Sequence, residues 1–167
     1  MKRREQARQI ALQALYQLDV RNEDVGPETI EFLRSSTNDP EVYFFARRLT
    51  EGAWAWRVEA DRFIEQAAEH WRIDRMAPVD RNVLRLATYE IGQCPDIPDR
   101  VAIDQAIELA KRFSAAESPA FVNGVLDRVL RLAKGDEAVQ AAEAARADAA
   151  PPDSADKPAA DDAARQD

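Results

Sequence analysis

Every stretch of this chain with a regular hydrophobic pattern repeats at about 3.6 residues, which is the period of an α-helix. Near the start, Ala7, Ala11, Ala14 and Leu18 recur at steps of four, three and four. No useful length of the sequence alternates apolar with polar residues, as a half-buried strand would. The sequence therefore predicts an all-α fold.

The longest apolar stripe begins after the helix-start signal Asp39-Pro40 and contains no proline. Its members are Phe45, Leu49, Ala53, Trp56, Ala60, Phe63, Ala67 and Trp71. One helix of about 30 residues would be about 45 Å long, which is more than one small core needs. We therefore predict two small helical bundles bridged by this long central helix.

Prolines mark the starts of the other helices, since proline is favoured in a first helical turn. Shorter helices are expected after Pro27, Pro78, Pro98 and the Ser118-Pro119 pair. Gly135 is expected to end the last of them.

The formal net charge of −8 argues, taken alone, against a nucleic-acid partner. However, residues 136–167 are rich in alanine and proline and carry nine acidic and three basic residues, so six of the eight charges belong there. We predict a domain over 1–135 and a mostly disordered acidic tail over 136–167, whose start could continue as a frayed helix. The opening MKRREQAR is locally +3, so the charge distribution permits RNA binding.

The residues that usually carry catalysis or metal binding are scarce. Cys94 and His70 are the only cysteine and the only histidine, and the five glycines are scattered singly, without a phosphate-binding loop. The sequence contains no run of about 18 apolar residues, the length that a membrane-spanning helix needs. We expect a cytoplasmic protein that is not an enzyme and holds no cofactor or metal.

Three local features need an explanation. The basic cluster Lys2, Arg3, Arg4 and Arg8 could bind phosphate groups, but the same charges could simply keep the start of a helix solvated. Gly124, inside FVNGVLD, costs about 1 kcal/mol in a helix, so it serves either close helix packing or a groove beside Phe121. Asp80 lies in the first turn of a predicted helix, where an acid interacts favourably with the helix dipole, so its presence needs no binding partner.

Four segments together resemble the NusB family of transcription antitermination factors. They are RREQARQIALQALYQ, VDRNVLRLATYEI, IPDRVAIDQAIELAKRF and FVNGVLDRV, and they span roughly residues 3–133. The resemblance implies an all-helical, non-enzymatic protein that binds boxA RNA jointly with NusE, a small-subunit ribosomal protein. It also implies assembly on RNA polymerase in an antitermination complex, notably on ribosomal RNA operons.

The resemblance places RNA contacts at Lys2, Arg3, Arg4 and Arg8. It places contacts with NusE near Asp80, Glu117 and Phe121, and it allows the last two to approach RNA. Glu5 and Gln6 stand where many family members are basic, so affinity for RNA without NusE is expected to be weak.

Two other functions stay open at this stage, as does the formation of a homodimer. One is a protein–protein adaptor with little RNA affinity of its own. The other is a detached RNA-targeting module of the kind fused to ribosomal RNA methyltransferases.

Overall fold

The computed structural model describes residues 2–149 and contains only helices over that range. Eight are α-helices: α1 (Arg3–Arg21), α2 (Pro27–Ser35), α3 (Pro40–Ala55), α4 (Arg57–Ala67), α5 (Pro78–Gln93), α6 (Asp99–Phe113), α7 (Ser118–Lys134) and α8 (Asp136–Ala149). A short 3-10 turn, η1 (Ile73–Arg75), lies between α4 and α5. The prediction of an all-α fold is confirmed.

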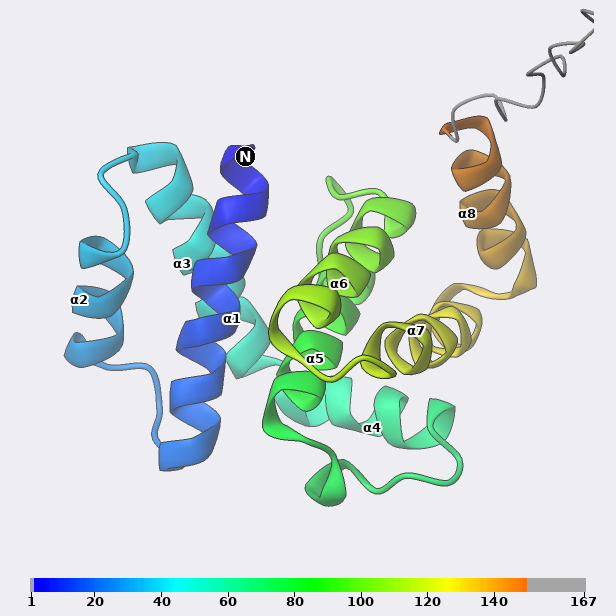
Figure 1. The fold of residues 1–167 in the computed structure, drawn as a ribbon, viewed down its shortest axis with the longest axis horizontal. Helices are drawn as coiled ribbons and strands as arrows, with labels where there is room; N and C mark the ends of the chain where they lie inside the picture. The colour runs from blue at the N-terminus through cyan, green and yellow to red at the C-terminus, as the bar shows by residue number, and fades with distance from the viewer. Residues whose placement is uncertain (1, 150–167) are drawn as a thin grey trace, which may run out of the picture.

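The helices form two groups that share α5 (Figure 1). Helices α1, α2 and α3 enclose a small apolar cluster that includes Ala7, Ile10, Leu33 and Val42. Helices α4, α6 and α7 surround α5, whose Val83, Leu84, Leu86 and Ile91 are almost fully buried. Because α1 and α3 also pack on α5, this helix joins the two groups.

The predicted bridging helix is divided into two at Trp56. The backbone of Trp56 has φ −96° and ψ 7°, so α3 ends and α4 begins in a new direction. Its indole rests on Gly92 of α5, where an added Cβ would come within 2.7 Å of the ring. Neither proline nor a change of period marks this break in the sequence, so the expectation of an unbroken helix was wrong at this point.

A second departure follows where α4 ends. Ala68 leaves the helical conformation with φ −96° and ψ 67°, and the chain continues as a loop to η1. Trp71, the last member of the predicted apolar stripe, is therefore 58% exposed rather than buried. This places a large aromatic side chain on the surface.

Residues 136–149 form helix α8 and do not belong to an unstructured tail. Gly135, with φ 88°, turns the chain back after α7, so that α8 packs against α6 and α7 (Figure 1). Val139 and Ala142 are buried there, and Arg146 bonds Asp104 of α6 at 2.8 Å. The helical start that the sequence left open extends to Ala149; the rest of the predicted tail lies outside the described residues.

Candidate functional site

The basic cluster at the start of α1 is divided by the structure. Lys2 is the residue before the helix, and Arg3 and Arg4 begin it, with all three exposed. Arg3 is held by two acids at the start of α3, Asp39 at 2.8 Å and Glu41 at 2.6 Å.

Arg4 makes no ion pair with another described residue. Its guanidinium lies 4.8 Å from the ring centre of Phe45, an arrangement that leaves its donors directed to solvent. Lys2 and Arg4 are therefore the cations of this cluster best placed to bind phosphate.

Arg8 does not belong to the exposed cluster, contrary to the prediction that it faces RNA. It is only 3% exposed and forms a two-pronged ion pair with Glu90 of α5, with both closest N–O distances at 2.9 Å. Burial raises the pKa of the Glu90 carboxyl, and the charge of Arg8 opposes that shift. Since Arg8 follows Arg4 by one turn, periodicity alone could not separate a surface cation from a buried one.

The structure brings Asp80, Glu117 and Phe121 together in one groove of about 350 Å³ between the loop before α5 and the start of α7. Trp71 and Phe121 meet there edge to face, with ring centres 6.1 Å apart. Arg75 and Met76 from the η1 region complete the opposite wall. The groove thus combines an aromatic floor with two carboxylates at its edge.

Asp80 is held rigidly at this edge. Its two carboxylate oxygens accept hydrogen bonds from the hydroxyls of Ser114, at 2.6 Å, and Ser118, at 3.0 Å. Glu117 is exposed at the start of α7 and has no ion-pair partner among the described residues. The geometry suits a partner with an apolar side chain beside a basic group.

A buried polar network holds the loop that forms the groove wall. Arg81 of α5 bonds Asp19 of α1 at 2.8 Å and donates to the backbone carbonyls of Ile73 and Met76. Arg85 bonds Asp61 of α4 at 2.7 Å and pairs with Asp19 at 3.1 Å, so it links the two carboxylates. Because one arginine contacts both α1 and the loop, the position of the groove wall depends on the packing of α1 against α5.

Asp19 is the charged centre of this network. Burial by itself raises the pKa of its carboxyl, but hydrogen bonds from Arg81 and Asn82 and the charge of Arg85 outweigh burial and hold it below the ordinary value. Asp19 therefore stays ionised and keeps both arginines in place.

A second surface was missed by sequence reasoning. Tyr16 and Val20 of α1 are 41% and 57% exposed, and Tyr16 lines a mainly apolar depression of about 400 Å³ together with Leu12, Val79 and Phe113. Tyr16 lies outside the alanine and leucine stripe of α1, and this was the signal available in the sequence. An exposed aromatic side chain beside an apolar hollow is typical of a protein-binding surface.

Other residues singled out by sequence have structural explanations. Gly124 has only the end of the Arg128 side chain near the place of a Cβ, at 3.8 Å, so it does not serve close helix packing. It also does not line the groove beside Phe121. Cys94 is buried at the end of α5, where burial raises the pKa of its thiol.

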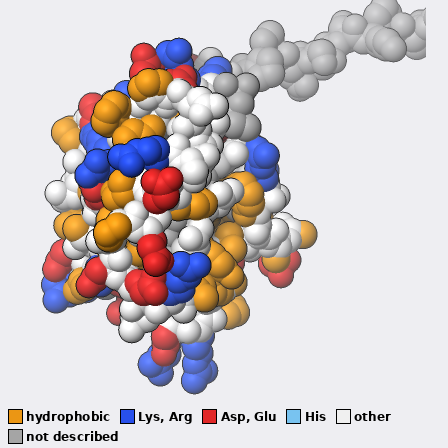
Figure 2. Space-filling model, turned by 90° about the vertical axis from the view of Figure 1, so that its left-hand side faces the viewer, with side chains coloured by type: hydrophobic (Ala, Val, Ile, Leu, Met, Phe, Trp, Pro, Cys, Tyr) orange, Lys and Arg blue, Asp and Glu red, His pale blue; other side chains and the backbone are white. Residues whose placement is uncertain are grey.

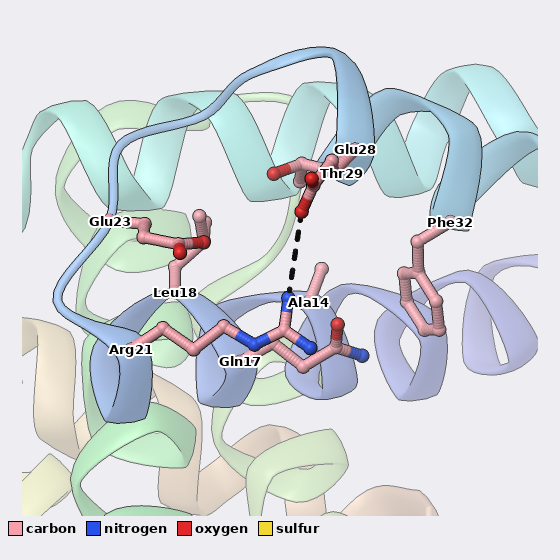
Figure 3. A pocket seen from close by; sticks show the side chains of 8 residues that line it. All are labelled: Ala14, Gln17, Leu18, Arg21, Glu23, Glu28, Thr29 and Phe32. Carbon is pink, nitrogen blue, oxygen red and sulfur yellow. Dashed lines mark ion pairs between the residues drawn. The ribbon is translucent and has the colours of Figure 1, made fainter.

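A small pocket between α1 and α2 has a volume of about 30 Å³, enough for about one water molecule (Figure 3). Arg21 and Glu28 approach each other across it at 3.8 Å. Within residues 2–149 no group of three or more acidic, cysteine or histidine side chains has a metal-binding arrangement. No helix in this range is long and apolar enough to cross a membrane.

The face on the side of the α1–α3 bundle does not present a continuous positive field. Figure 2 shows basic and acidic side chains interspersed there, with apolar side chains between them. This face therefore carries charges of both signs and not a basic patch.

Comparison with known proteins agrees with this architecture. Residues 5–131 match the model of the NusB family. The transcription antitermination protein NusB of Symbiobacterium thermophilum is 47% identical over 148 residues, covering 81% of this chain and 97% of that protein. Its counterpart in Myxococcus xanthus is also 47% identical, over 75% of this chain and 93% of its own length.

Solved structures show the same likeness. NusB from T. maritima superposes with a TM-score of 0.70 at 35% identity, covering 84% of this chain and 98% of its own. A chain in a crystal structure of the antitermination factors NusB and NusE with double-stranded RNA gives a TM-score of 0.71 at 28% identity, over 79% of this chain and 98% of its own. The chain belongs to the NusB family.

Proposed function

We propose that this protein is a transcription antitermination factor that binds boxA RNA together with NusE and promotes processive transcription, notably of ribosomal RNA operons. The likeness of nearly the whole folded chain to NusB proteins carries this proposal. Residues 1–135 are the proposed RNA-binding domain, to which α8 is an addition. The protein acts without catalysis of its own, in the cytoplasm, as part of a complex on RNA polymerase.

The charge arrangement supports a division of labour between this chain and NusE. Arg3 is paired with acids and Arg8 is buried, so the N-terminal cluster offers RNA mainly Lys2 and Arg4. A few phosphate contacts give weak and strongly salt-dependent binding. NusE, bound at a different surface, supplies the further contacts that make binding tight.

Two surfaces are proposed for NusE. The groove of Asp80, Glu117 and Phe121 offers carboxylates beside aromatic rings, and the depression around Tyr16 offers an apolar face. Aromatic side chains in such surfaces often carry most of the binding free energy. The groove holds two carboxylates against one cation, Arg75, so its net negative charge favours a basic protein segment over an RNA backbone.

The test is a mobility-shift titration of boxA RNA with this protein, with NusE and with both, at two salt concentrations. We expect weak binding by the protein alone and much tighter binding by the pair. Equal affinity for boxA and for a scrambled RNA of the same length would overturn the proposal. Tight binding of NusE with no gain in RNA affinity would instead support the function of a protein–protein adaptor.

A further inference from the structure

Helices α1 and α6 are neighbours in the fold but are inclined to each other and make few contacts (Figure 1). A groove of about 220 Å³ lies between their side chains. Glu5 and Gln9 line it from α1. Gln105, Glu108, Leu109, Lys111 and Arg112 line it from α6.

The polar side chains of the groove are available for a ligand. Gln9 and Gln105 are half-buried on opposite walls, and neither amide bonds another side chain within the described part of the chain. Each amide offers both donors and an acceptor, the combination that reads the edges of nucleic-acid bases. The nearly buried Leu109, 5% exposed, gives the groove an apolar floor.

Two cations line the groove, and a third lies just before α1. Lys2 directly precedes α1, three residues ahead of Glu5, and is exposed. Arg112 is exposed and has no carboxylate partner among the residues described. Lys111 is paired only with Glu108 in its own helix, at 3.1 Å with both side chains 58% exposed, an arrangement that contributes little.

The groove also leads toward the protein-binding surface. Its lining residues Gln9 and Arg112 are followed along the two helices by Leu12 and Phe113, which line the depression around Tyr16. A single strand of RNA bound in this groove would therefore extend from the basic start of α1 to the surface proposed for NusE.

We propose that the α1–α6 groove is the base-reading part of the RNA interface, a deepening that rests on the proposed function. Gln9 and Gln105 contact base edges, and Lys2 and Arg112 hold phosphates. Glu5 repels phosphate and accepts hydrogen bonds, so it faces the amino group of a base rather than the backbone. A single strand fits because its bases are free to turn into the groove.

The test uses the full chain with NusE, boxA RNA and a scrambled RNA of equal length, titrated over a range of salt. Arg112→Gln should lower the affinity for both RNAs by roughly fivefold. It should also lower the slope of log K against log salt by about 0.7, the value for the loss of one phosphate contact with a single strand. Gln9→Ala and Gln105→Ala should each reduce the preference for boxA by about tenfold and leave the slope unchanged.

Arg62→Gln is the matched control, because Arg62 is 64% exposed on α4 and paired only with Glu59. It should change neither affinity nor slope, and circular dichroism should show all variants folded. Groove variants that bind both RNAs like the wild type would overturn the proposal. So would loss of NusE binding with RNA binding intact, because the groove would then be a protein surface.

The proposed function can fail separately from the groove. A wild-type complex that binds boxA no better than scrambled RNA would overturn the proposed function, and the groove assignment with it. A wild-type preference for boxA that survives in both glutamine variants would overturn the groove assignment alone.

Discussion

The guanidinium of Arg8 and the carboxylate of Glu90 face each other in the interior, joining α1 to α5 through two nitrogens and two oxygens. Removing one partner of such a pair leaves an uncompensated buried charge. We expect Arg8→Ala or Glu90→Ala to lower the free energy of unfolding by about 3–5 kcal/mol, measured by urea denaturation.

A double change separates this structural role from an RNA contact. Arg8→Met combined with Glu90→Leu replaces the pair by apolar side chains of similar size, which is often neutral or stabilising. We expect the double variant to fold and to bind boxA with NusE as the wild type does. Loss of RNA binding in a folded double variant would show that Arg8 contacts RNA after all.

Arg4 should contribute more than Arg3 to the affinity for RNA. Arg4 lies on the ring of Phe45 without an acidic partner, whereas Arg3 would have to leave Asp39 and Glu41 to meet a phosphate. Arg4→Gln should lower the slope of log K against log salt by about 0.7, and Arg3→Gln should lower it by less. Fluorescence anisotropy with labelled boxA RNA measures both slopes.

Arg34→Gln provides the control for these two variants. Arg34 is 65% exposed on α2 and pairs only with Glu31, at 3.7 Å. Equal slopes for the Arg3, Arg4 and control variants would contradict the assignment of Arg4.

Phe121 is expected to be a protein contact that the fold can lose. Its ring is half-buried against Trp71 at the edge of the core. Phe121→Ala should weaken NusE binding by about tenfold or more, as truncation of an aromatic contact usually does. Isothermal titration calorimetry measures this, and a thermal melt should show the variant still folded. An unfolded variant would instead identify Phe121 as a core residue.

Two glycine substitutions should have opposite effects on stability. A Cβ at Gly52 would overlap the hydroxyl oxygen of Tyr89, so Gly52→Ala should destabilise the protein by about 1–3 kcal/mol. A Cβ at Gly124 meets only a mobile arginine end, so Gly124→Ala should stabilise the helix by up to about 1 kcal/mol. Chemical denaturation of both variants checks the signs, and a destabilising change at Gly124 would contradict the packing described for it.

Low pH should reduce the stability of the folded protein through protonation of Asp19. Its pKa is held below the ordinary 3.8 in the folded protein, so the unfolded chain takes up the proton first as pH falls. The stabilisation is complete above pH 3.8 and is lost as pH falls through the lower folded value. Asp19→Asn should therefore be less stable than the wild type at pH 6, and the difference should shrink below about pH 4.

Urea unfolding at several pH values measures this difference. Asp74→Asn is the control, since Asp74 is 60% exposed and paired only with Arg72. A difference between wild type and Asp19→Asn that stays constant down to pH 2.5 would contradict the role given to Asp19.

The sequence predicts helix starts well, because proline acts locally: α2, α3 and α5 each begin at a proline. The break at Trp56 was not predictable in this way. It depends on an indole packing over a glycine that lies 36 positions later in the chain. Tertiary contact overrides a continuous local pattern there.

The candidate site shows the same division. Motif order brought Asp80, Glu117 and Phe121 to attention, and the structure places them in one groove. The burial of Arg8 depended on Glu90, which is distant in sequence, and the exposure of Trp71 depended on where α4 ends. Residues whose environment is set by a distant partner could not be assigned from their spacing.

Helix α1 is fastened to α5 near both of its ends, by Arg8 with Glu90 and by Asp19 with Arg81. A rod fixed at two points has little freedom to tilt or slide when a ligand binds at one end. If RNA and NusE strengthen each other's binding, the gain must then arise where the two ligands touch, and not from a shape change relayed through this protein. If the protein binds RNA and NusE as proposed, it therefore holds the two at a fixed distance from each other.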